Sequence, residues 1–169
     1  MQMRAREKLK SFIIKADCFW WASILLDLIY QFIAYEVKTR GKPPHPIPYL
    51  CWARAMIMIV KDSKKVWLIE EWLDIDDHER PFAKYIDNCF VNLCIPEMVP
   101  PKAQETADYL VFTQHVQWEK TQFVAFISDY LGIGDILTDP QITTNPYVMP
   151  DFSFNPLLTF NQQACKGCP

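Results

Sequence analysis

The stretch that decides the fold runs from Gln122 to Ile142 and reads QFVAFISDYLGIGDILTDPQI. Its opening segment, Gln122–Ile127, is apolar enough for a buried strand. Asp129 follows that strand and precedes a glycine, and strand ends are where side chains leave the core and face a cleft. Asp139 comes ten residues later, between a threonine and a proline. We expect both acids in loops that the intervening glycines fold back on each other.

Two interpretations of this pair of acids remain open. Converging carboxylates suit Mg²⁺, or one carboxylate orients a nucleophile while the other holds a metal. Aspartate before glycine or proline is also ordinary turn chemistry, in which the carboxylate caps a backbone N–H. The spacing of Asp129 and Asp139 does not decide between a metal site and a pair of turn residues.

Length and composition limit the class of protein. A chain of 169 residues can bury one sizeable core and is expected to form one domain. Its 50% apolar and 22% charged residues exclude a disordered chain. The net charge of −3 and the pI of about 5.6 argue against general nucleic-acid binding, which needs a basic surface. With only four glycines, several glycine-rich phosphate loops are hard to build.

An amphipathic helix is predicted over residues 15–38, ending before Gly41. Polar residues form one row of this segment, and Asp27 near its middle would cost about 2.5–3.5 kcal/mol inside a membrane. We therefore expect a helix packed into a core, and a membrane anchor is the alternative. The apolar residues that recur at helical spacing are Leu25, Leu28, Ile29, Phe32 and Ile33.

Strands and a second helix follow in the sequence. Two β-like runs, Ala53–Val60 and Val66–Leu73, flank a polar segment typical of a hairpin turn. A proline-rich break precedes a further helix over Ala103–Val116. Because helices and hairpins are mixed along the chain, the expected fold class is α+β.

Cysteine and histidine offer a possible metal site. Cys18, Cys51 and Cys89 sit in apolar company and are expected to be buried thiols in a reducing compartment, the cytoplasm. Cys165 and Cys168 form a CxxC pair that suits a metal or a redox couple. His115 would join them in a zinc set that is one ligand short of four, although a lone histidine on a helix is more often a hydrogen-bonded core residue.

The motif Ile127-Ser128-Asp129-Tyr130-Leu131-Gly132, leading into Leu137-Thr138-Asp139-Pro140-Gln141-Ile142, resembles that of the alpha-kinases, an atypical family of serine/threonine protein kinases. Phe112–Gln117 resembles the helix with the zinc-binding histidine, in a form common in the fungal branch. Residues 68–73, followed by Phe82-Ala83-Lys84-Tyr85, resemble the hinge strand and the segment after it. The resemblance implies an alpha-kinase fold.

The resemblance also implies roles for single residues. Asp139 would be the catalytic aspartate, Asp129 a Mg²⁺ ligand, and Glu70 a residue of the adenine-binding hinge. What remains of a structural zinc site would be His115, Cys165 and Cys168. The implied cofactors are ATP and Mg²⁺, with zinc as a further possibility, and the implied partner is a protein substrate of unknown identity. From the charge and the first helix we expect no nucleic-acid partner, and a membrane is the less favoured one.

Departures from the family pattern keep several hypotheses open. Leu131 stands where the family has a Mg²⁺-binding glutamine, and Gln163 where it has a second zinc histidine. Residues 1–169 would be a partial kinase domain, mainly the C-lobe with the last helix and strands of the N-lobe, without the strands that carry the phosphate loop and the ATP lysine. We expect weak Mg-ATP binding, weak or absent zinc, and no measurable phosphorylation. The alternatives are an active kinase, a pseudokinase or binding module, and an unrelated membrane-anchored protein.

Overall fold

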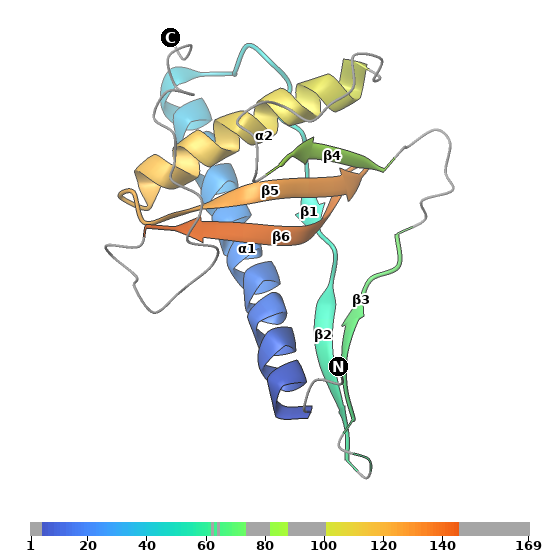
Figure 1. Cartoon of the computed structure of the whole chain (residues 1–169). Helices are drawn as coiled ribbons and strands as arrows, with labels where there is room; N and C mark the ends of the chain where they lie inside the picture. The colour runs from blue at the N-terminus through green and yellow to red at the C-terminus, as the bar shows by residue number, and fades with distance from the viewer. Residues whose placement is uncertain (1–4, 62, 64, 74–81, 88–100, 146–169) are drawn as a thin grey trace.

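The computed structural model describes residues 5–61, 63, 65–73, 82–87 and 101–145, and these form two helices and six strands. Figure 1 shows the long helix α1 behind a small sheet, and α2 alongside the strands β4 and β5 of that sheet. The expected α+β class is confirmed. In chain order the elements are α1 (Ala5–Arg40), β1 (Cys51–Trp52), β2 (Ala55–Val60), β3 (Lys65–Glu70), β4 (Ala83–Ile86), α2 (Pro101–Lys120), β5 (Ala125–Ile133) and β6 (Ile136–Thr144).

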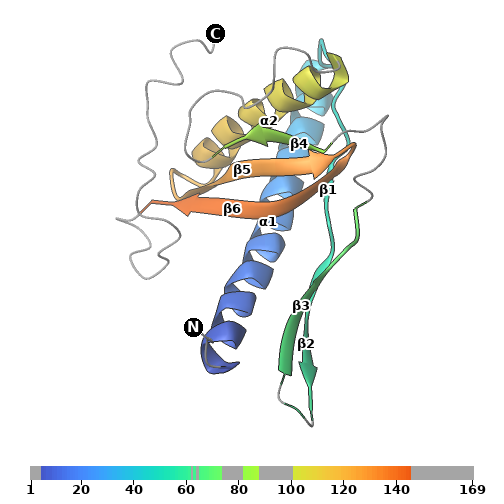
Figure 2. The ribbon, with the colours of Figure 1, turned by 45° about the vertical axis from the view of Figure 1, so that its right-hand side comes forward.

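The central sheet has the strand order β1-β6-β5-β4. β1 runs parallel to β6, whereas β4, β5 and β6 are antiparallel neighbours. Both helices lie on the same side of this sheet in Figure 2. The second sheet is the hairpin of β2 and β3, which extends along the N-terminal half of α1 (Figure 1). The hairpin expected around residues 61–65 is therefore confirmed.

The core lies between the helices and the central sheet. α1 contributes Ala22 and Ile29, which are fully buried, and α2 contributes the equally buried Leu110. They pack with Ile127 and Leu137 from the two middle strands. The amphipathic core helix expected from the sequence is thus confirmed. In the described part of the chain, neither helix is long and apolar enough to cross a membrane.

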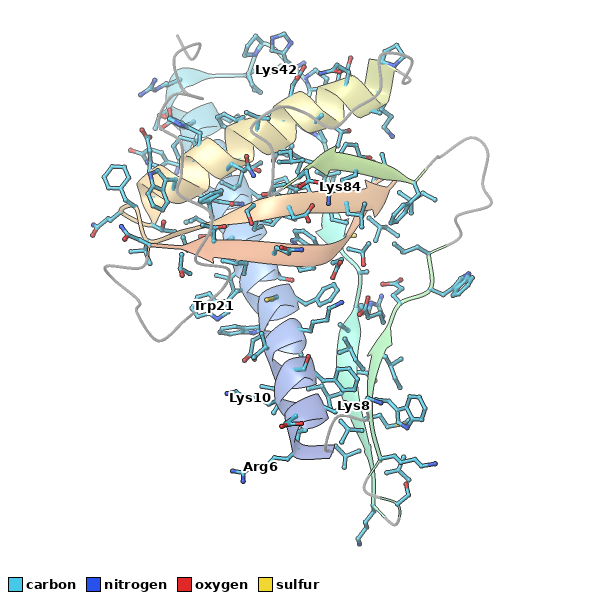
Figure 3. The ribbon with its side chains drawn as sticks, in the orientation of Figure 1. Arg6, Lys8, Lys10, Trp21, Lys42 and Lys84 are labelled. Atoms are coloured by element: carbon cyan, nitrogen blue, oxygen red, sulfur yellow. The ribbon has the colours of Figure 1, made fainter. Side chains whose placement is uncertain are left out.

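The first helix is longer than its sequence suggested. It begins at Ala5, ten residues before the expected start at residue 15, and its 36 residues include a run of basic side chains. Apolar periodicity marks only the part of a helix that packs against a core. The first turns carry exposed charges such as Arg6 and Lys10, which point into solvent in Figure 3, so this signal is missing there.

The expectation that Asp129 and Asp139 lie in loops is wrong, because both belong to strands, β5 and β6. The turn between these strands consists of Gly134 and Asp135, and Gly134 has a positive φ of 58°. A two-residue Gly-Asp loop is a common hairpin connection, so the strands run on both sides of it. Gly132, expected in the turn, lies inside β5, where a Cβ would collide with the Ile136 carbonyl oxygen.

Candidate functional site

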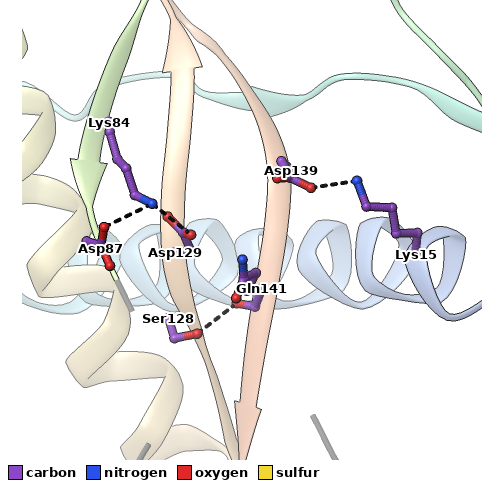
Figure 4. Close-up of polar contacts among 7 residues, drawn as sticks. All are labelled: Lys15, Lys84, Asp87, Ser128, Asp129, Asp139 and Gln141. Atoms are coloured by element: carbon purple, nitrogen blue, oxygen red, sulfur yellow. Dashed lines mark hydrogen bonds and ion pairs between the residues drawn. The ribbon is translucent and has the colours of Figure 1, made fainter. Parts of the chain in front are cut away.

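The two aspartates of the motif lie on neighbouring strands of the central sheet. Asp129 on β5 pairs with Gln141 of β6, two residues beyond Asp139. The register of the two strands shifts on both sides of Asp129, and Asp139 adopts a positive φ of 46°. This irregular part of the ladder brings both carboxylates to the same region of the molecule (Figure 4).

Asp129 is a buried acid with an incomplete set of partners. Its side chain is only 6% exposed, and Oδ2 lies 3.3 Å from Nζ of Lys84. The other oxygen, Oδ1, is buried and has no hydrogen-bond partner among the described residues. Burial raises the pKa of Asp129 above its ordinary value, although the ammonium of Lys84 acts in the opposite direction. A buried carboxylate oxygen without a partner is costly, so this atom is a natural ligand for a cation.

Lys84 on β4 bridges two carboxylates. Its Nζ lies 3.1 Å from Oδ2 of Asp87 and 3.3 Å from Oδ2 of Asp129. Burial alone would lower the pKa of Lys84, but the two neighbouring carboxylates outweigh it and raise the pKa. Lys84 therefore stays charged and holds the β5 carboxylate in place.

Asp139 is the more accessible of the two acids. Its side chain is 47% exposed, and Oδ1 lies 2.9 Å from Nζ of Lys15 on α1. The hydrogen bond with Asp139 raises the pKa of Lys15 against the effect of burial, and the charge of Glu70 at the end of β3 adds to this. Lys15 therefore pairs with the expected catalytic aspartate, and the expected hinge residue Glu70 acts on it only through its charge.

The charges of this cluster favour a divalent cation. Two ammonium groups, on Lys15 and Lys84, face four carboxylates, which leaves two negative charges among the described side chains. The carboxylates are those of Glu70, Asp87, Asp129 and Asp139. Asp139 also contributes to the raised pKa of Asp129, so the two acids interact electrostatically. Mg²⁺ typically takes one or two carboxylates and completes its shell with water and phosphate oxygens, so a site here would need no third carboxylate.

A buried hydrogen-bond network fixes the strand that carries Asp129. The fully buried Tyr130 accepts a hydrogen bond from Nε2 of Gln117 at 3.1 Å, and its hydroxyl lies 3.0 Å from Oγ1 of Thr113. Oε1 of the same Gln117 accepts from the backbone N–H of Ile127 at 2.9 Å. These contacts join α2 to β5 on both sides of Asp129, so the acid has a rigid support.

Lys15 and Lys84 are the site residues that sequence analysis missed. Lys84 was noted only as part of a motif, and Lys15 only as the first residue of the predicted helix. Helical spacing does carry a signal for Lys15, because residues four, seven and fourteen positions later are the buried Phe19, Ala22 and Ile29. A lysine at this position of the helix can reach the sheet, and Lys15 does so through its ion pair with Asp139 on β6.

The zinc set stays a prediction. His115 lies on α2, where its Nε2 is 3.3 Å from Oε1 of Glu119, and Cys165 and Cys168 lie outside the described residues. Among the residues that the structure does describe, no three His, Cys, Asp or Glu side chains form a group that could hold a metal ion. Cys18 is buried as expected, whereas Cys51 is exposed, because the two-residue strand β1 turns its side chain outward.

Comparison with known proteins identifies relatives of the whole chain. The model of the alpha-kinase family matches residues 2–165. A solved structure of the alpha-kinase domain of myosin-II heavy chain kinase A, an apoenzyme, is 17% identical with a TM-score of 0.42, and the match covers 85% of this chain and 46% of that one. A complex of the same kind of domain with AMP is 16% identical with a TM-score of 0.38, covering 75% and 46%. The chain therefore spans less than half of these structures. No curated protein matches it.

Proposed function

The chain belongs to the alpha-kinase family, and we propose that Asp129 and Asp139 form a Mg-ATP site that serves phosphoryl transfer to a hydroxyl group of a protein. The observation that carries this proposal is the buried, unpartnered Oδ1 of Asp129 on the strand next to Asp139. An orphaned carboxylate oxygen beside a second, half-exposed acid suits a metal ion that bridges to phosphate.

The proposed roles follow from the exposure of each acid. Asp129, buried and held by Lys84, is the fixed metal ligand. Asp139, half exposed, can reach a substrate and accept the proton of its hydroxyl group as that oxygen attacks the terminal phosphorus of ATP. The bond between that phosphorus and the oxygen that bridges it to ADP breaks, and ADP leaves with the electron pair. A bound Mg²⁺ would neutralise the charge of the phosphates, and Glu70 would lie at the adenine.

A second candidate function is nucleotide binding without transfer. It is favoured by Leu131 on β5, which pairs with Lys84 of β4 and Thr138 of β6 and offers no oxygen to a metal ion. A hard cation needs oxygen ligands, so the family's glutamine has no equivalent at this position. In this case the chain binds Mg-ATP weakly and transfers nothing, as expected from its sequence.

Two measurements distinguish these candidates. The first is transfer of radiolabelled phosphate from ATP to a basic peptide, with Asp139→Ala as the control. Transfer that disappears in the variant supports the kinase. The second is Mg-ATP binding by calorimetry, with Asp129→Asn as the control. Binding that weakens in this variant, without any transfer, supports the second candidate, and absence of Mg-ATP binding contradicts both.

A further inference from the structure

Lys15 reaches the proposed site from α1, an element that carries none of its acids. Its Nζ lies 2.9 Å from Oδ1 of Asp139, and both side chains are about half exposed. We propose that Lys15 is the phosphate-contacting cation of this chain and that its ammonium donates a hydrogen bond to a phosphate oxygen of bound ATP. This inference rests on the proposed function and adds a residue to it.

The first argument is reach. An ammonium group has three N–H donors, and the ion pair with Asp139 uses one of them. The side chain of Lys15 is 50% exposed and that of Asp139 is 47% exposed, so a ligand can approach this ion pair from solvent. A phosphoryl group that approaches Asp139 from the exposed side could therefore accept a hydrogen bond from Lys15 as well.

The second argument is that Lys15 keeps its charge. Asp139 and Glu70 both favour the ammonium form, and together they outweigh burial. A charged donor suits a phosphate oxygen, because charge-assisted hydrogen bonds are roughly twice as strong as neutral ones.

The third argument comes from comparison with the other lysine. Lys15 and Lys84 approach the two aspartates from opposite sides (Figure 4). Lys84 already has two carboxylates within 3.3 Å, those of Asp87 and Asp129, and its side chain is 40% exposed. Lys15 has one ion-pair partner among the described residues and is the more exposed. Of the three N–H donors on each ammonium group, the ion pairs among the described residues leave two on Lys15 and one on Lys84.

An opposite role for the same contact is testable. If Lys15 only neutralised Asp139, it would compete with the metal ion and its removal would strengthen binding. If Lys15 contacts phosphate, its removal weakens binding by roughly ten- to a hundred-fold, the range for one charge-assisted hydrogen bond. The two roles therefore differ in the sign of the effect.

The experiment measures Mg-ATP binding by calorimetry for the unmodified chain and four variants. Lys15→Met removes the charge, and Lys15→Arg keeps it. Lys10→Met is the matched control, because Lys10 lies on the same helix and points away from the sheet in Figure 3. Asp129→Asn reports on the metal site itself. Circular dichroism of each variant shows that α1 and the fold remain intact.

We expect Lys15→Met to weaken binding at least ten-fold, Lys15→Arg to stay within a few-fold of the unmodified chain, and Lys10→Met to leave it unchanged. Tighter binding in Lys15→Met, or an equal loss in Lys10→Met, overturns the inference. Binding that depends on Asp129 but not on Lys15 overturns the inference and leaves the proposed function standing. Absence of any Mg-ATP binding overturns both.

Discussion

Tyr130→Phe tests the buried network that supports the candidate site. Oγ1 of Thr113 lies 2.7 Å from the Leu110 carbonyl oxygen and donates its proton to it. A threonine hydroxyl has a single proton, so the hydroxyl of Tyr130 must donate to Thr113. The same tyrosine oxygen accepts from Nε2 of Gln117. The substitution therefore removes one hydrogen bond at each of two buried side chains without changing the shape of the ring.

The cost follows from which groups lose their partners. Gln117 is fully buried, so its Nε2 cannot find water in place of Tyr130. A buried donor left unsatisfied costs about 1–3 kcal/mol. Thr113 still donates to the Leu110 carbonyl oxygen, so losing its bond with Tyr130 costs less free energy. We expect Tyr130→Phe to lower the free energy of unfolding by about 2 kcal/mol, which is a large part of the stability of a domain of this size.

Urea denaturation followed by circular dichroism measures this change. The matched control is Tyr85→Phe, because the Tyr85 ring on β4 is also buried and its hydroxyl has no hydrogen bond among the described residues. We expect the control to change the free energy of unfolding by less than about 0.5 kcal/mol. Equal effects of the two substitutions would show that the hydrogen bonds of the Tyr130 hydroxyl add nothing to the free energy of unfolding.

Three further predictions concern the strands and the thiols. Gly132→Ala should destabilise the fold by at least about 2 kcal/mol in urea denaturation, because its Cβ would collide with the backbone of Ile136, and an unchanged midpoint would be inconsistent with this close approach. Asp129→Asn should raise stability at pH 7, since a raised pKa means that the ionised acid opposes folding. This gain should shrink as the pH falls through the raised pKa of Asp129 towards about 3.9, and pH-dependent thermal melts measure it. Mass-spectrometric mapping after alkylation should find Cys51 modified and Cys18 protected, because burial raises the pKa of Cys18 to about 11, and equal labelling of the two in the folded chain would contradict this.

The sequence predicted the elements whose side chains pack in a regular pattern. Leu25 and Ile29 repeat at helical spacing, and both are buried in α1. The hairpin of β2 and β3 was also predicted, because a polar segment separates two apolar runs. In each case the pattern lies within one short stretch of sequence, so the information is local.

The sequence predicted the beginning of β5 but ended that strand before Asp129, and it missed β6, for a physical reason. Asp129, three residues before Gly132, and Asp139, directly before a proline, have the composition of turns. Yet Asp129 pairs with Gln141, and the ladder between β5 and β6 resumes on both sides of Asp139. The left-handed backbone of Asp139 and the register shifts around Asp129 accommodate residues that a regular strand would disfavour. Such irregularities depend on the partner strand, so a single segment does not reveal them.

The contacts of the site were only partly predictable. The motif placed Asp129 and Asp139 in one region, and the structure agrees that they are on neighbouring strands. The ion pair between Lys15 and Asp139 joins residues more than a hundred positions apart, on elements whose packing decides the contact. No pattern within either segment predicts that the side chains of Lys15 and Asp139 meet.

The most direct test of the account is a crystal structure of the chain with Mg²⁺ and a non-hydrolysable ATP analogue. We predict a metal ion on Oδ1 of Asp129, the terminal phosphate beside Asp139, and a phosphate oxygen within hydrogen-bond distance of Nζ of Lys15. A nucleotide bound elsewhere, or a metal ion that leaves Oδ1 of Asp129 without a partner, would contradict the assignment of these aspartates to one Mg-ATP site.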